Sequence, residues 1–312
     1  PEGVQRRDRG PLRRGAPAHL RHRRLAVGRV YQLHHVGSQP QVRRCLLEYA
    51  DDHLGLGAVV TAGGSGIGRT IAETLADNGA QVFVCDVAED HLQALAAARP
   101  DIDAVTADVS LSADVESLFD AAVAAMGGVD VLVNNAGVAG PTKRVEDISD
   151  DEWRSTIGVD VDGQFYCARR AVPLMQEAGK GAIVNISSTA GRLAFPLRLP
   201  YATAKRAVIG LTDTLAMELG PRNISVNAVL PGYVLNDRAR RVLQAKADAS
   251  GRSLDEIKEI VLSRISMRTG IEEQEIADLV LYLCSPQGRH ISGQAINIDA
   301  NLETYAGMDK LD

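Results

Sequence analysis

The sequence predicts an α/β fold in which helices cover both faces of a single doubly wound parallel sheet. Two observations lead to this prediction. From Leu56 onward, strand-like and helix-like segments alternate along the chain, which is the pattern of successive β-α-β units. The strand-like segments are near-continuous apolar runs, as expected for parallel strands that are buried on both faces.

The individual elements follow from these apolar runs and from the segments between them. The expected strands cover 57–62, 81–87, 101–109, 129–137, 181–188, 224–232 and 293–300. The expected helices cover 68–79, 89–98, 112–126, 150–178, 200–219 and 272–284, and a long polar helical insertion covers 237–270. Gly79 marks the end of the first helix, because glycine readily adopts the left-handed conformation of a helix C-terminus.

Residues 1–54 differ in composition from the rest of the chain. They carry eleven Arg, no Lys and five acidic residues, a net charge of +6, whereas the remaining residues carry −12. The segment has neither helical nor strand periodicity, and its Arg, Gly and Pro content is typical of disorder. It is interpreted as an unstructured extension, as non-native residues translated from an upstream start, or as a nucleic-acid arm. We favour the first two, expect no nucleic-acid partner, and treat residues 55–312 as one catalytic domain.

Composition excludes several classes of protein. No apolar run reaches the about 20 residues that cross a bilayer, and the N-terminus shows no secretory signal, so we expect a cytoplasmic protein without a membrane partner. The four cysteines, Cys45, Cys85, Cys167 and Cys284, lie far apart and near no histidine cluster. They predict neither a disulfide framework nor a metal site.

The first strand and the first helix are joined by a glycine-rich turn, Gly63-Gly64-Ser65-Gly66-Ile67-Gly68. Glycine weakens both flanking elements, so its use here indicates that a ligand approaches the backbone closely. Such a turn holds a dinucleotide pyrophosphate on backbone N–H groups and on the helix N-terminus, and Ser65 adds a hydroxyl. Asp86 ends the second strand, where a carboxylate binds the adenosine ribose hydroxyls and repels a 2′-phosphate. The sequence therefore predicts NAD rather than NADP.

A second motif, SSTAGRLAFPLRLPYATAK, contains Ser188, Tyr201 and Lys205. Tyr201 and Lys205 are one helical turn apart and share a face, and Ser188 follows a strand at the carboxyl edge of the sheet, where ligands of such folds bind. An ammonium group stabilises a phenolate, so Tyr201 can take a proton from an alcohol or donate one to a carbonyl. A buried tyrosine beside a snorkelling lysine is the alternative. The joint presence of the glycine turn and Asp86 favours catalysis.

From Leu56 to Leu302 the sequence resembles the short-chain dehydrogenase/reductase family, which has a Rossmann-type fold. The family's T-G-x-x-x-G-x-G turn corresponds to 61–68, with Ala62 in place of the first glycine, and its Asp-Val and N-N-A-G motifs correspond to 108–109 and 134–137. The resemblance implies cofactor contacts from Thr61, Gly63, Ser65, Gly66, Ile67, Gly68, Asp86, Asp108, Val109, Asn135, Ala136, Gly137, Tyr201, Lys205, Pro231, Gly232, Val234 and Asn236.

The resemblance also implies catalytic roles. Ser188 orients the substrate oxygen, and Lys205 stabilises the Tyr201 phenolate and binds the nicotinamide ribose. Enoyl-reductase relatives separate Tyr and Lys by six residues, so the spacing of four here indicates alcohol and carbonyl chemistry. The family's catalytic asparagine, which shapes a helix bulge, is Asp160 in this chain, and this adds a negative charge near Lys205. The family's threonine that meets the nicotinamide carboxamide is replaced by Asn236.

Residues 236–270 match the position of the family's substrate lid. We expect the substrate to contact Leu193, Phe195 and Tyr233, which favours an apolar alcohol. For an acidic substrate the candidate contacts are Arg192, Arg198 and lid arginines such as Arg238. The family implies a homotetramer through helices 150–178 and 201–220. The first of these helices places apolar side chains at helical spacing, namely Trp153, Ile157, Val161 and Phe165.

The sequence thus predicts an NAD(H)-dependent oxidoreductase that interconverts a secondary alcohol and its ketone. The alternative is a non-catalytic NAD-binding regulatory protein, because fold does not fix function. The complete set of Ser188, Tyr201 and Lys205 favours the enzyme.

Overall fold

The computed structural model describes residues 55–302, except for the side chain of Ala249. The predictions about residues 1–54, Cys45 and residues 303–312 lie outside this range. Within it, seven parallel strands form one sheet in the order β3-β2-β1-β4-β5-β6-β7. The predicted fold class is confirmed, because the chain starts at β1 in the middle of the sheet and winds outward to both edges.

The strands and helices lie close to the predicted ranges. The strands are β1 (Gly57–Thr61), β2 (Gln81–Asp86), β3 (Ile102–Thr106), β4 (Val131–Asn134), β5 (Gly181–Ile186), β6 (Ile224–Pro231) and β7 (Gln294–Ile298). The main helices are α2 (Gly66–Asp77), α3 (Glu89–Ala98), α4 (Ser112–Met126), α5 (Asp150–Ile157), α6 (Gly163–Ala178), α7 (Leu199–Leu219), α8 (Asp237–Ser250), α9 (Leu254–Ser263) and α10 (Glu273–Leu283).

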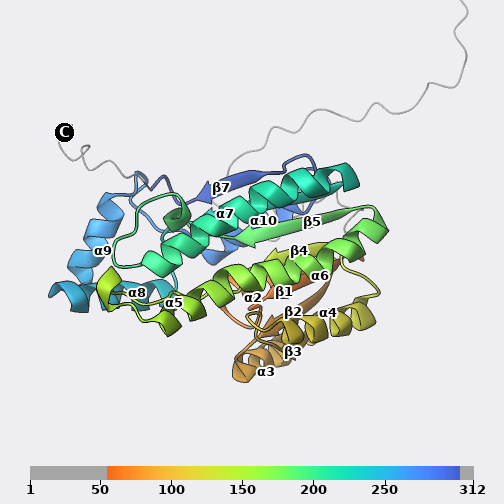
Figure 1. The fold of residues 1–312 in the computed structure, drawn as a ribbon, viewed down its shortest axis with the longest axis horizontal. Helices are drawn as coiled ribbons and strands as arrows, with labels where there is room; N and C mark the ends of the chain where they lie inside the picture. Colours follow the sequence, from red (N-terminus) through yellow and green to blue (C-terminus); the bar gives the residue numbers. More distant parts are fainter. Residues whose placement is uncertain (1–54, 303–312) are drawn as a thin grey trace, which may run out of the picture. The chain divides into compact units, whose positions relative to one another are not determined.

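Two apolar cores cover the two faces of the sheet. Successive residues of a strand point to opposite faces, so Val60 belongs to one core and Val59 to the other. Helices α2, α3 and α10 cover the first face, and α4, α6 and α7 cover the second. Figure 1 shows α6 and α7 in front of the sheet and α10 behind it. None of the helices in the described range is long and apolar enough to cross a membrane.

Two predicted helices are divided in the structure. The expected helix 150–178 contains a π-helical segment, η2 (Gly158–Asp162), between α5 and α6. The expected single helical insertion 237–270 is two helices, α8 and α9. Gly251 takes a left-handed φ of 67° after α8, and Ser253 begins α9 with a capping box, so one helix ends and a second begins within the insertion.

The carboxyl ends of the strands meet at one edge of the sheet. In Figure 1 the arrowheads of β5 and β7 point toward the end of the molecule that carries α8 and α9. The loops that follow β1, β2, β4, β5 and β6 therefore lie at this edge, which is where an open α/β sheet binds its ligands.

Candidate active site

The turn from β1 into α2 leaves no room for a side chain at Gly63, Gly64 or Gly68. A Cβ added to Gly68 would lie 2.2 Å from the carbonyl oxygen of Ala62 and 2.4 Å from Asn135 Nδ2, and Gly66 has a φ of 55°. The N-cap residue Ser65 makes no side-chain capping hydrogen bond. Because the first N–H groups of a helix have no intrahelical acceptor, this turn presents free donors on a closely approachable backbone. It fits a dinucleotide pyrophosphate.

Asp86 lies beside this turn at the end of β2. Its side chain is buried, and Oδ2 accepts a hydrogen bond of 3.2 Å from Gly64 N while Oδ1 accepts one of 3.0 Å from Ala88 N. His91 on α3 places Nδ1 3.8 Å from Oδ2. The carboxylate is thus fixed against the glycine turn, with a half-exposed imidazole beside it. No sequence motif indicated His91.

Tyr201, Lys205 and Asp160 form the centre of the site. Lys205 Nζ lies 5.7 Å from the centroid of the Tyr201 ring and 3.5 Å from Asp160 Oδ2, and Lys205 and Asp160 are both buried. The ammonium also donates a hydrogen bond of 3.1 Å to the Ile186 carbonyl at the end of β5. Since Tyr201 and Lys205 belong to the first two turns of α7, their position is set by the packing of α7 on β6 and by the hydrogen bond of Lys205 to the end of β5.

Ser188 lies two residues beyond β5, at the start of a short 3₁₀ turn. Its hydroxyl accepts a hydrogen bond of 3.1 Å from Ala190 N. The turn packs tightly on α7, because a Cβ on Gly191 would lie 2.6 Å from the carbonyl oxygen of Lys205, and Ser187 Oγ donates to that oxygen at 2.7 Å. The structure therefore anchors the serine loop to the helix that carries Tyr201 and Lys205.

Comparison with known proteins agrees with this arrangement. A family model described as enoyl-(acyl carrier protein) reductase matches residues 61–301. A 3-oxoacyl-(acyl-carrier-protein) reductase, FabG, of Staphylococcus epidermidis is 33% identical over 250 residues, covering 78% of this chain and 98% of the relative. The chain is a member of the short-chain dehydrogenase/reductase family of oxidoreductases.

Two crystal structures extend the comparison. A variant of actinorhodin polyketide ketoreductase with NADPH has a TM-score of 0.76 and 34% identity, covering 80% of this chain and 97% of that one. An NAD⁺-bound xylitol dehydrogenase has a TM-score of 0.76 and 28% identity, covering 80% and 99%. Similar family members thus hold a nicotinamide cofactor, and both phosphorylated and unphosphorylated forms occur among them.

This short-chain dehydrogenase/reductase departs from the family pattern at Asp160, and the structure shows what the aspartate contacts. Asp160 lies within the π-helical segment η2, so the bulge expected at this position is present. Its Oδ1 accepts a hydrogen bond of 2.6 Å from Val138 N. Gly137 is next to it, since a Cβ there would lie 3.0 Å from Lys205 Nζ and 3.1 Å from Asp160 Oδ1.

The second departure, Ala62, has a backbone cost. Its φ is 50°, a left-handed conformation that costs a residue with a Cβ roughly 1–2 kcal/mol. The neighbouring Asn135 side chain donates to the carbonyl oxygens of Thr61 and Ala62 at 3.0 and 3.2 Å. These bonds stabilise the turn in the conformation that the family's glycine would adopt freely.

Several predicted cofactor residues bind to other parts of the protein. Thr61 Oγ1 accepts hydrogen bonds from the backbone N–H of Asn135 and Ala136 at 3.0 and 2.9 Å. Asp108 Oδ1 accepts from Ser110 N and Oγ. Val109 is buried in the core against Gly163. These side chains hold the loops at the sheet edge in place.

The loop after β6 is also held by protein contacts. A Cβ on Gly232 would lie 2.5 Å from Asp299 Cβ, so this loop sits directly on the chain after β7. Pro231 closes β6, and the buried Val234 pairs with Ile271.

The Asn236 side chain forms hydrogen bonds at the start of the lid. Its Oδ1 caps α8 by accepting from Ala239 N at 2.9 Å, and its Nδ2 donates to Glu273 Oε1 at 2.7 Å. Glu273 is also close to the glycine turn, because Oε1 would lie 3.4 Å from a Cβ on Gly66. A contact from Asn236 to nicotinamide would have to use the second N–H of Nδ2 or the second lone pair of Oδ1. Sequence reasoning missed Glu273, because only the fold brings α10 to α2.

The expected substrate residues are divided between two surroundings. Tyr233 packs with the small apolar core of the lid formed by Leu243, Ala247 and Ile257, and burial raises the pKa of its hydroxyl. Leu193 and Phe195 are half-buried on the loop before α7, and Arg238 is exposed on α8. The Phe195 ring lies under two cations, with Arg198 Cζ at 5.6 Å and Lys246 Nζ at 4.2 Å from its centroid. The surface expected to contact an apolar substrate therefore also carries positive charge.

Proposed function

We propose that this enzyme interconverts a secondary alcohol and its ketone with NAD(H), using Tyr201 as the general acid and base. The observation that carries the proposal is the position of Lys205, whose buried ammonium lies 5.7 Å from the centroid of the Tyr201 ring and 3.5 Å from Asp160 Oδ2. A positive charge beside a phenol stabilises the phenolate, which is the form that can accept a proton.

The reaction divides into two transfers. In the oxidative direction, the substrate hydroxyl gives its proton to the Tyr201 phenolate oxygen while the carbinol carbon loses a hydride. A nicotinamide cofactor held at the glycine turn and Asp86 would supply the hydride acceptor in this direction and the hydride donor in the reverse one. Ser188 donates a hydrogen bond to the substrate oxygen, which stabilises the charge that develops on it during either transfer.

Asp160 modifies the effect of Lys205 on Tyr201. Its carboxylate is an ion-pair partner of Lys205, so its negative charge partly cancels the positive potential that the ammonium produces at Tyr201. The carboxylate also fixes the lysine against the Ile186 carbonyl and the Gly137 loop. We infer that Asp160 keeps Lys205 in place, which is a positioning role.

Asp86 supports the choice of NAD over NADP. Its carboxylate is held beside the glycine turn by two backbone N–H groups, at the strand end where the adenosine ribose lies in such folds. A 2′-phosphate there would meet a buried negative charge, and no arginine forms an ion pair with Asp86 in the described range.

The test measures binding and turnover separately. Calorimetry should give a Kd for NAD at least about tenfold below that for NADP, a difference of about 1.4 kcal/mol. A panel of secondary alcohols should yield NADH, and Tyr201→Phe should lower kcat at least about a hundredfold with NAD affinity unchanged. Equal affinities would refute the cofactor assignment. Substantial turnover by the phenylalanine variant would refute the role of Tyr201.

A further inference from the structure

We propose that the substrate of this enzyme carries a carboxylate, and that Arg198 binds it beside Tyr201. The proposal rests on the function proposed above, since it names the class of alcohol or ketone. The sequence alone favours an apolar substrate, and the present proposal replaces that expectation.

Arg198 is a buried cation with an unused donor. It stands at the N-cap of α7 and is only 2% exposed. One Nη group donates to the carbonyl oxygen of Ala139, whereas the buried Nε has no acceptor among residues 55–302. A buried N–H without an acceptor destabilises a protein, and the more so when the group is charged. A ligand that supplies an acceptor would remove this cost.

The position of Arg198 connects it to the reacting atoms. Arg198 directly precedes α7, and its Cζ lies 5.0 Å from the centroid of the Tyr201 ring. A group bound to this guanidinium therefore lies next to the residue that exchanges the substrate proton. A short hydroxy acid or keto acid can reach both with one molecule.

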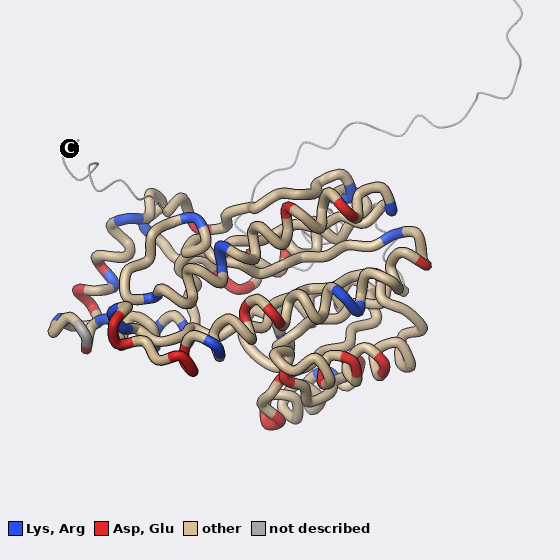
Figure 2. Tube along the Cα trace, viewed as in Figure 1, with Lys and Arg blue, Asp and Glu red and all other residues tan. Residues whose placement is uncertain are grey.

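The surroundings of Arg198 are rich in positive charge. Burial lowers the pKa of Arg198, and Arg238 acts in the same direction, whereas Tyr201 and Asp160 oppose it. Burial likewise lowers the pKa of Lys246, followed by the charges of Arg198 and Arg264. Figure 2 shows the basic positions of α8 at the same end of the molecule as the start of α7. Arg198 stands at the start of α7, and the other three cations, Arg238, Lys246 and Arg264, belong to the lid, residues 236–270.

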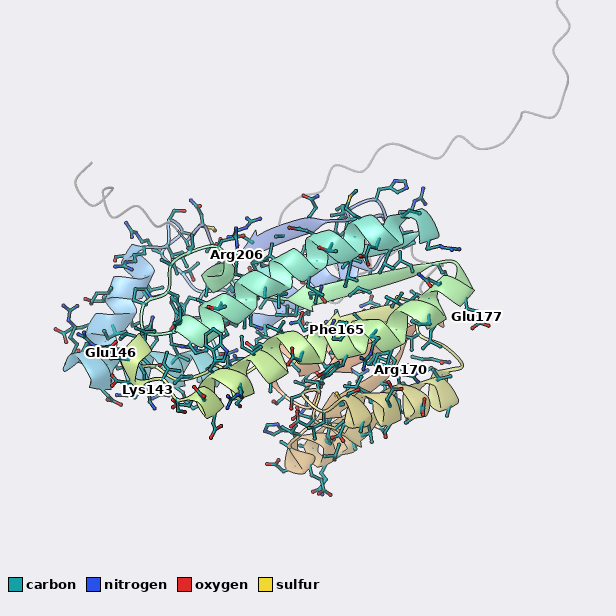
Figure 3. All side chains as sticks on the ribbon, in the orientation of Figure 1. Lys143, Glu146, Phe165, Arg170, Glu177 and Arg206 are labelled. Atoms are coloured by element: carbon teal, nitrogen blue, oxygen red, sulfur yellow. The ribbon has the colours of Figure 1, made fainter. Side chains whose placement is uncertain are left out.

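None of these four cations has a carboxylate partner in an ion pair within residues 55–302. Arg170 shows the ordinary arrangement, because it pairs with Glu116 and Asp120 of α4 and is labelled in Figure 3. Asp160, the nearby buried acid, is paired with Lys205. An anion entering the site would thus meet uncompensated positive charge.

The geometry favours a carboxylate among anionic groups. A guanidinium matches the two oxygens of a carboxylate, and Arg198 has already committed one donor to Ala139. The Phe195 ring packs against its guanidinium, with Cζ 5.6 Å from the ring centroid, which limits the space beside it. A compact planar anion fits this position better than a tetrahedral phosphate with three charged oxygens.

The experiment compares matched acids and amides. Lactate, 3-hydroxybutyrate and 4-hydroxypentanoate, in both configurations, are each paired with the primary amide of the same skeleton, which differs chiefly in charge. For the full-length enzyme with saturating NAD, kcat/KM is measured for each pair, and the thermal shift of the NADH-bound enzyme is measured with the same compounds. At least one acid should exceed its amide at least tenfold in kcat/KM or stabilise the enzyme where the amide does not.

Two variants locate the effect. Arg198→Met should bring the ratio of acid to amide close to one, whereas Arg252→Met, which removes an exposed charge from the lid, should leave the ratio unchanged. A ratio near one in the parent enzyme, or one that persists in Arg198→Met, would overturn the proposal. So would the lack of any Arg198-dependent thermal shift across the acids, if no compound is turned over. If the parent enzyme still oxidises neutral alcohols in a Tyr201-dependent way, the proposed function stands without the carboxylate. If the parent enzyme neither turns over any alcohol nor binds NAD, the proposed function itself is rejected.

Discussion

Replacing Gly68 with alanine should displace the start of α2 and weaken both the fold and dinucleotide binding. The added Cβ would lie 2.2 Å from the Ala62 carbonyl oxygen, and relief to an ordinary contact of about 3.5 Å requires a shift of roughly 1 Å. The Asn135 amide, 2.4 Å from the same Cβ, holds Thr61 and Ala62 by hydrogen bonds, so neither neighbour can move without loss.

The magnitude follows from these contacts. Overpacking typically costs about 1–3 kcal/mol, and weakening a hydrogen bond of Asn135 adds about 1 kcal/mol. For a domain of this size, each kcal/mol lowers Tm by about 2–4 °C, so Gly68→Ala should lose roughly 5–10 °C. Because the N–H groups of the first turn move with the helix, NAD affinity should fall at least about tenfold, or 1.4 kcal/mol.

The matched control is Gly128→Ala, where an added Cβ meets nothing within 4 Å. It should change stability by no more than about 0.5 kcal/mol and leave NAD binding unchanged. Thermal unfolding followed by circular dichroism gives Tm, and calorimetry gives the Kd of NAD. A Gly68→Ala enzyme that unfolds at the parent temperature and binds NAD with parent affinity would refute the reasoning from close approach.

Three further outcomes are expected. Glu273→Gln removes a negative charge beside Gly66 and keeps an acceptor for Asn236, so NAD should bind several-fold more tightly by calorimetry; weaker binding would contradict this. Trp153 and Phe165 are 37% and 45% exposed on α5 and α6, and Figure 3 shows Phe165 on the outward face of α6. Light scattering should therefore give a tetramer, or at least a dimer, that Phe165→Asp dissociates; a monomeric parent at micromolar concentration would argue against it. Burial raises the pKa of Cys85 to about 12, so this thiol stays protonated at pH 8 and should react with iodoacetamide only after unfolding, which mass spectrometry checks; rapid labelling of Cys85 in the native protein would be the opposing result.

The sequence alone predicted the elements and the chemistry that depend on local spacing. Helices α3 and α4 begin and end at the predicted residues, because caps and apolar periodicity act within a few residues. The glycine turn and the pair of Tyr201 and Lys205 were also predictable, since residue type and a separation of one helical turn define their geometry. Asp160 was expected near Lys205 from the resemblance to the family, and the structure places their charged atoms 3.5 Å apart.

Only the tertiary structure decided which side chains are buried and which distant residues meet. The sequence offers Arg198 as one of several arginines that could meet an acidic substrate. The structure shows that Arg198 is buried against the loop after β4 and the rings of Phe195 and Tyr201, whereas Arg192 and Arg238 are exposed. Glu273 reaches Asn236 and the start of α2 because α10 packs on α2. Burial and contacts of this kind depend on elements that are far apart in the chain, and they determine where charge is left uncompensated in the site.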